Sequence, residues 1–190
     1  MCAAFFNAAA VFCTGLVVKT MDDLLDEEDL LSIPYFARLG SGLAPYTLAL
    51  FSLASAFNFR LSFGLFWASY CLGMIKSPFE KLPTGLRANT EVILGIILML
   101  LVIGARKTFW SVLIMAAVQL IDDFLDFKED QIVKAANAAL VLGRVECFLT
   151  ALIFFYPALN LLPWESLFSW CFALVIGNGR IFRRGAPPWS

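Results

Sequence analysis

Residues 113–130 read LIMAAVQLIDDFLDFKED, an apolar run that passes directly into an acid-rich stretch. The apolar part is typical of a membrane helix, because lipid is the solvent that such a run needs. The acidic part contains Asp122, Asp123, Asp126 and Asp130. An Asp costs about 2.5–3.5 kcal/mol at the centre of a span and less at its edge. Acids placed there therefore predict a functional site.

The same pattern occurs one hundred residues earlier in the chain. Met21–Asp26 reads MDDLLD and Ile121–Asp126 reads IDDFLD, and each copy ends an apolar run and precedes a loop. The second copy comes four expected helices after the first, so both helices should run the same way across the membrane. We interpret this as an internal four-helix repeat, with halves of about 1–105 and 106–190 in a single transmembrane domain, 1–190.

The composition also favours a membrane protein. Of the 190 residues, 61% are hydrophobic and 15% charged, with a mean hydropathy of +0.81. A soluble domain is nearer half apolar and a quarter charged. We therefore predict an all-α, polytopic transmembrane helical bundle of about seven spans. The expected spans are residues 3–20, 43–59, 61–76, 90–105, 107–122, 137–158 and 165–179.

The connections between these spans alternate in length. Tight turns are expected near residues 58–60 and 104–107. Longer polar loops are expected at residues 22–42, 77–89 and 123–136.

The basic residues predict the orientation. With seven spans, one face collects Lys19, Arg38, Lys76, Lys81, Arg87, Lys128, Lys134, Arg144, Arg180, Arg183 and Arg184. The other face collects only Arg60, Arg106 and Lys107. Because cytoplasmic loops are enriched in Lys and Arg, the long loops and both acidic motifs should lie on the cytoplasmic side.

Several functional classes are excluded. The chain has no histidine, which rules out His-ligated metals and Ser-His or Cys-His catalytic pairs. The five cysteines are scattered without a CxxC, as expected of small buried hydrophobes. The sequence has no basic stripe of the kind that would indicate nucleic-acid binding. The first twenty residues lack the basic start of a signal peptide and are expected to be the first span.

Hard oxygen ligands without histidine suit magnesium, which is usually held by one or two carboxylates together with substrate phosphates. On a helix Asp22, Asp26 and Asp29 share one face, and so do Asp123, Asp126 and Asp130. Two such clusters could grip a diphosphate through bridging ions and favour ionisation of an allylic carbon. Some of the nineteen phenylalanines could line the hydrocarbon path. The alternative is that both clusters are acidic helix ends in solvated loops.

These residues resemble the UbiA superfamily of intramembrane prenyltransferases over roughly residues 7–180. The family has an NDxxDxxxD motif at one helix end and a DxxxD motif four helices later. The stretch from Asp122 to Asp130 resembles the second motif. The stretch from Asp22 to Asp29 resembles the first, with Asp in place of Asn and the last acid one residue early. Three further segments are similar to family segments: residues 38–42, 70–76 and 142–144.

The resemblance implies a magnesium-dependent transferase that moves an isoprenyl group from an isoprenyl diphosphate to an acceptor dissolved in the membrane, aromatic or lipid. The family usually has nine spans, and relative to these we expect the given chain to lack the first and the last. The implied catalytic, magnesium-holding residues are Asp22, Asp26, Asp122 and Asp126. Supporting metal residues would be Asp23, Asp29, Asp123 and Asp130. Arg38, Lys76 and Lys128 would contact diphosphate, and Tyr70 would orient diphosphate or acceptor.

Two alternatives stay open. A terpene cyclase on the same scaffold would use the same ionisation with an intramolecular acceptor. A non-catalytic membrane subunit would keep the fold alone.

Overall fold

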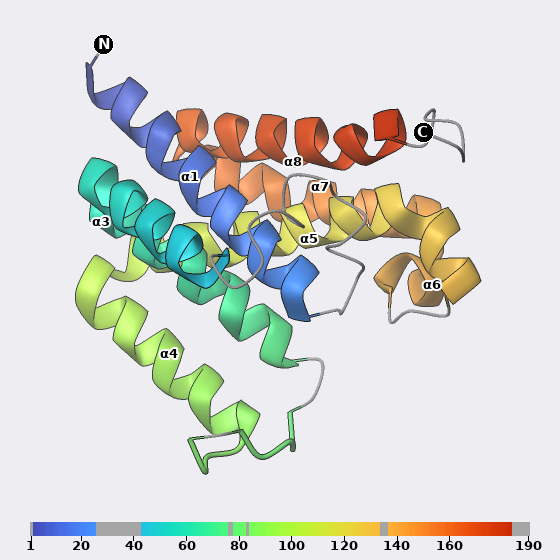
Figure 1. The fold of residues 1–190 in the computed structure, drawn as a ribbon, viewed down its shortest axis with the longest axis horizontal. Helices are drawn as coiled ribbons and strands as arrows, with labels where there is room; N and C mark the ends of the chain where they lie inside the picture. Colours follow the sequence, from blue (N-terminus) through green and yellow to red (C-terminus); the bar gives the residue numbers. More distant parts are fainter. Residues whose placement is uncertain (1, 26–42, 76–77, 83, 134–136, 184–190) are drawn as a thin grey trace. The chain divides into compact units, whose positions relative to one another are not determined.

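The computed structural model of the chain describes residues 2–25, 43–75, 78–82, 84–133 and 137–183. Within these ranges the regular structure is helical, apart from one isolated β-bridge, and the all-α prediction is confirmed. The helices are α1 (Cys2–Leu25), α3 (Leu43–Ile75), α4 (Ala88–Ile103), α5 (Ala105–Val133), α6 (Ala138–Leu142), α7 (Arg144–Leu161) and α8 (Pro163–Arg183) (Figure 1). They form two compact units, Met1–Thr108 and Phe109–Ser190, whose boundary falls in the first turn of α5.

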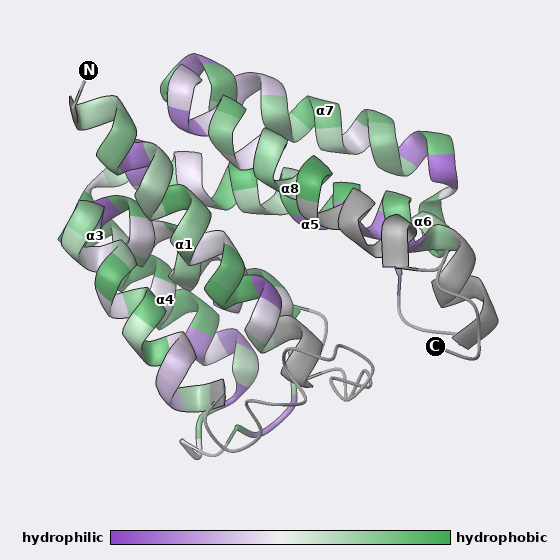
Figure 2. Ribbon diagram, turned by 45° about the horizontal axis from the view of Figure 1, so that its top comes forward, coloured by the Kyte–Doolittle hydropathy of each residue, from purple (hydrophilic) through white to green (hydrophobic). Residues whose placement is uncertain are grey.

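Among the described residues, four helices are long and apolar enough to cross a membrane. The candidate spans are Ala3–Met21, Ala44–Ile75, Ala105–Phe127 and Arg144–Leu161. Large apolar side chains lie on their outer surfaces, such as Ile153 with 68% exposure. In Figure 2 hydrophobic residues predominate along α7, and hydrophilic ones lie where it begins. By length and composition the chain is an integral, multi-pass membrane protein.

The helix α3, counted above as one candidate span, is two shorter apolar helices that fold back on each other. Asn58 has an extended backbone, with φ −156° and ψ 95°, between the two halves. The ring centroids of Phe51 and Phe66 lie 4.8 Å apart. In a straight helix fifteen residues would separate them by about 22 Å. The tight turn predicted at residues 58–60 is therefore confirmed, and the two halves correspond to the predicted segments 43–59 and 61–76.

Small and polar residues hold the first unit together. The Asn58 side-chain amide donates to Oδ1 of Asn7 at 2.8 Å, and its own Oδ1 accepts from the Leu61 N–H at 3.2 Å. Asn58 is thus both the N-cap of the second half of α3 and a link to α1. On α4, a Cβ at Gly95 would stand 2.9 Å from Sγ of Cys71. Glycine here lets α4 approach α3 closely.

The second unit packs α5, α7 and α8 around one apolar core. Ile121, Ala151 and Ala173, one from each helix, are buried at its centre. A polar contact adds to this packing, because Nε1 of Trp110 donates to Oγ of Ser166 at 2.9 Å. Tight packing and a few interhelical hydrogen bonds are what holds helices together in lipid, where apolar burial alone adds little.

Two sequence predictions about the second unit were wrong. Residues 123–136 were expected to be a polar loop, but α5 continues as a helix to Val133. The span 137–158 was expected to be continuous, but it breaks at Gly143 into α6 and α7, and α7 extends to Leu161. The break follows from a left-handed backbone at Gly143, with φ 104°, which residues with a Cβ rarely adopt. The tight turn predicted at 104–107 is confirmed, with Gly104 between α4 and α5.

Candidate functional site

The second acidic motif lies on α5 in the second unit. Asp122 and Asp126 are one helical turn apart and therefore share a face of α5. Asp126 is buried, with 9% exposure, and Asp122 is half-buried. A buried carboxylate is costly unless it is neutralised, hydrogen-bonded or bound to a metal. Two carboxylates at this spacing form a compact set of hard oxygen ligands.

Asp123 faces a different side of α5 and anchors α6. Its Oδ2 accepts a hydrogen bond from the Ala138 N–H at 3.0 Å. The side-chain amide of Asn137 donates to the backbone carbonyl of Asp123 at 2.9 Å, and Oδ1 of Asn137 accepts from the Ala139 N–H at 2.6 Å. Asn137 is the N-cap of α6 and is buried. The motif on α5 and the first turn of α6 are therefore one hydrogen-bonded assembly.

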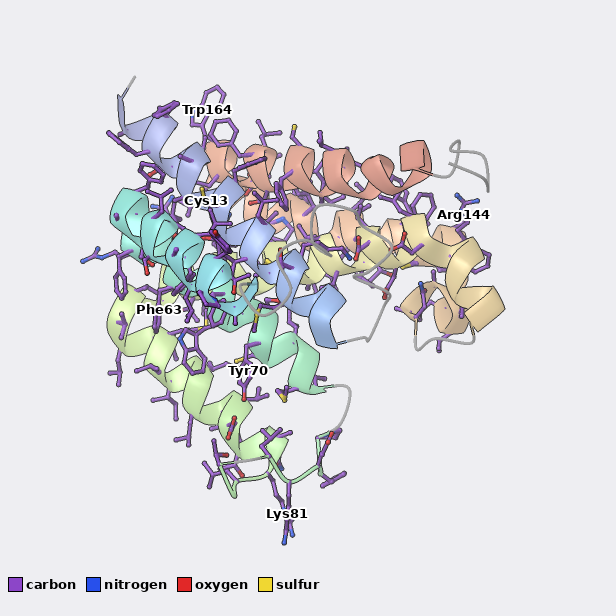
Figure 3. All side chains as sticks on the ribbon, viewed as in Figure 1. Cys13, Phe63, Tyr70, Lys81, Arg144 and Trp164 are labelled. Carbon is purple, nitrogen blue, oxygen red and sulfur yellow. The ribbon has the colours of Figure 1, made fainter. Side chains whose placement is uncertain are left out.

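A cation lies next to this assembly. The guanidinium carbon of Arg144, at the start of α7, is 4.7 Å from the centroid of the Phe124 ring. Figure 3 marks Arg144 at the corner between α6 and α7. Phe124 lies between the acids of the motif, and its ring also packs on Phe148 at a centroid distance of 5.3 Å. A cation held over an aromatic face keeps its charge available to an anion nearby.

The donor chemistry of these residues fits magnesium. Asp122 and Asp126 supply carboxylate oxygens, and Mg²⁺ is usually held by one or two carboxylates plus substrate phosphates and water. In the described part of the chain no three acidic, cysteine or histidine side chains form a group that could hold a metal alone. Further ligands would therefore come from substrate phosphates or from residues outside the described ranges. The third carboxylate of the motif, that of Asp123, accepts the hydrogen bond from the first turn of α6.

The other sequence-predicted residues are distributed as follows. Asp22 and Asp23 are helical residues in the last turn of α1. Lys128 and Asp130 lie on the helical backbone of α5, beyond Asp126. Outside the described residues are Asp26, Asp29, Arg38 and Lys76. The predicted pairing of the two acidic motifs stays a prediction.

Tyr70 lies in the first unit, near the end of α3. Its hydroxyl donates a hydrogen bond to the Glu91 carboxylate at the start of α4, and the Thr84 hydroxyl donates to the other carboxylate oxygen. The ring of Tyr70 packs edge-on against Trp67, with centroids 5.6 Å apart. Tyr70 thus links α3 to the beginning of α4, and its predicted substrate role stays a prediction.

Two residues of the candidate site were missed in the sequence. Asn137 follows the apolar-to-polar transition after α5, and an Asn before an apolar run is a recognisable N-cap signal. Arg144 was counted in the cytoplasmic charge excess and in the family-like segment 142–144, but it was not predicted to be a site residue, although Gly143 directly before it indicates a chain break. Their contacts with Asp123 and Phe124 join residues at least fourteen positions apart, so no local pattern could reveal them.

Comparison of the chain with protein-family models, with curated proteins and with solved structures gives no match. Its function must therefore be inferred from its own residues.

Proposed function

We propose that the chain is a UbiA-like, magnesium-dependent intramembrane prenyltransferase. It would transfer an isoprenyl group from an isoprenyl diphosphate to an acceptor dissolved in the membrane. The single observation that carries the proposal is the pair Asp122 and Asp126 on α5. These acids lie one turn apart in a candidate membrane span, and Asp126 is buried. Acids at such a position are expensive, so a function is the expected reason for them.

Each residue of the assembly has a role in the proposal. Asp122 and Asp126 would hold magnesium with their carboxylate oxygens, and the bound ion would supply the positive charge that stabilises a diphosphate leaving group. Asp123 fixes α6 against α5 and so keeps the motif at a constant distance from the start of α7. Arg144, held over Phe124, offsets diphosphate charge with a fixed cation.

The first motif completes the proposed site. Asp22 and Asp26, supported by Asp23 and Asp29, would provide a second set of magnesium ligands for the same diphosphate, and Asp130 would support the first. Arg38, Lys76 and Lys128 are the further diphosphate contacts, and Tyr70 orients acceptor or diphosphate. The proposal requires both motifs on the cytoplasmic side. It also requires all seven apolar segments to lie in the membrane, including α4, α8 and each of the two halves of α3.

A product assay tests this proposal. The purified chain is incubated in lipid nanodiscs with isoprenyl diphosphates of several lengths, with magnesium or with a chelator. We expect diphosphate release that depends on magnesium and increases when a mixture of aromatic and lipid acceptors is supplied. The prenylated acceptor should be detectable by mass spectrometry.

The other outcomes assign other functions. Magnesium-dependent release that is independent of any acceptor, with a cyclic hydrocarbon as product, identifies a terpene cyclase. No release with any length of substrate, from protein that is folded by thermal melting, favours the non-catalytic subunit.

A further inference from the structure

A short hairpin connects α3 to α4 and presents two cations side by side. Its described residues are 78–82 and 84–88, and an antiparallel bridge pairs Lys81 with Arg87. The Leu82 N–H donates to the carbonyl of Leu86 at 3.0 Å and closes the turn. The hairpin is thus a defined structure, with hydrogen bonds that fix which residues oppose each other.

The pairing places like charges together. Residues directly opposite in an antiparallel pair have Cβ atoms about 4.5–5.5 Å apart on the same side, and like charges there repel. Both side chains are exposed, and within the described residues neither forms an ion pair. Figure 3 shows Lys81 pointing away from the helices. Such a pair is stabilised when an anion lies between the two cations.

The position of the hairpin identifies the surface that it meets. It begins three residues after Ile75, where a candidate span ends, and it leads directly into the apolar helix α4. Apolar side chains accompany the cations, because Phe79 is 76% exposed and Leu86 is 40% exposed. Cations beside exposed apolar side chains at the end of a span fit the boundary between phospholipid headgroups and acyl chains.

We infer that this hairpin binds the headgroup of an anionic phospholipid. The lipid phosphate lies between Lys81 and Arg87, where the Arg guanidinium can bind two of its oxygens. Phe79 reaches the top of the acyl chains, as aromatic residues at membrane interfaces do. The inference rests on the hairpin's own residues and does not depend on the proposed catalysis.

The test measures lipid binding to the full chain, purified in an uncharged detergent. Phosphatidylglycerol and phosphatidylcholine with identical acyl chains are titrated and counted by native mass spectrometry. We expect tighter binding of phosphatidylglycerol, weakened by salt. Lys81→Gln and Arg87→Gln should each lower that affinity about fivefold, as expected for one cation at an anionic surface, and leave phosphatidylcholine binding unchanged.

Arg60→Gln is the matched control. It also removes one exposed cation, but at the turn at the other end of the second half of α3. We expect phosphatidylglycerol binding to this variant to match the unmodified chain. The double variant Lys81→Gln/Arg87→Gln should melt at the same temperature or higher, because a repulsion is removed.

Two results would overturn the inference. One is equal phosphatidylglycerol affinity in the unmodified chain and the double variant. The other is displacement of phosphatidylglycerol by an isoprenyl diphosphate that itself loses affinity in the double variant, which would assign the two cations to the substrate.

Discussion

The side chain of Asp123 accepts a hydrogen bond from the backbone N–H of Ala138 at 3.0 Å, which ties the acidic motif of α5 to the first turn of α6. Its neighbours in the motif, Asp122 and Asp126, share another face of the helix. Asp123 therefore positions the corner between α5 and α7. In the proposed function, the other two acids of the same stretch would hold the metal.

Asp123→Ala should destabilise the second unit by about 1–2 kcal/mol, because the Ala138 N–H would lose its charged acceptor. Asp123→Asn keeps an acceptor oxygen and should lose about half of that or less. Equilibrium unfolding in mixed micelles measures both. Equal stability of Asp123→Ala and the unmodified chain would show that this hydrogen bond does not hold α6.

Asn58→Ala should cost about 1–2 kcal/mol, because it removes both the cap on Leu61 and the hydrogen bond to Asn7. Asn7→Ala removes the interhelical bond but not the cap on Leu61, and the loss of that bond should cost about 0.6 kcal/mol. The double variant should be no less stable than Asn58→Ala in the same unfolding assay. Fully additive losses would mean that the two side chains act independently.

Gly95→Ala should destabilise the first unit by about 1–3 kcal/mol, because the new Cβ would press on Cys71 and Trp67. Gly73→Ala is the control, since a Cβ there meets nothing within 4 Å. It should be neutral or stabilising by about 0.5–1 kcal/mol. Replacing Cys71 by Ala should reduce the loss of stability caused by Gly95→Ala. Thermal melting measures these variants, and equal melting temperatures for Gly95→Ala and Gly73→Ala would refute close packing of α3 and α4.

The sequence predicted the turns at which a polar residue or a glycine interrupts an apolar run. Asn58 and Gly104 both stand where the hydropathy falls, and both end a helix. The sequence did not predict the break at Gly143. The residues directly before it are apolar, so the expected span 137–158 was drawn through it. Only the left-handed backbone at this residue separates α6 from α7.

The charged residues after Asp123 were interpreted as a loop, but they are helical to Val133. Polarity indicates contact with water or a ligand, and a helix can carry polar residues beyond the end of its apolar part. Likewise, the sequence identified the acids of the candidate site but not their partners. The contacts of Asn137 and Arg144 depend on how α6 and α7 return to α5, which is a tertiary property.

The orientation predicted by the basic residues can be tested by labelling. In a cysteine-free background, Glu27→Cys and Lys128→Cys should react with an impermeant maleimide only from the cytoplasmic side, because eleven of the fourteen basic residues are expected there. Arg60→Cys should react from outside. Labelling of positions 27 and 128 from outside alone would reverse the topology.

The most direct test of the central claim is the rate at which Asp126→Asn protein releases diphosphate from geranylgeranyl diphosphate with magnesium. Asn keeps the size and one oxygen but removes the charge that holds the metal, so we expect turnover to fall to background. Stability without metal should hold or rise as carboxylate repulsion is relieved, and magnesium-dependent stabilisation by a diphosphate ligand should shrink. Glu146→Gln, outside both motifs, should retain activity. Release by Asp126→Asn at the rate of the unmodified chain would contradict the account and favour the non-catalytic membrane subunit.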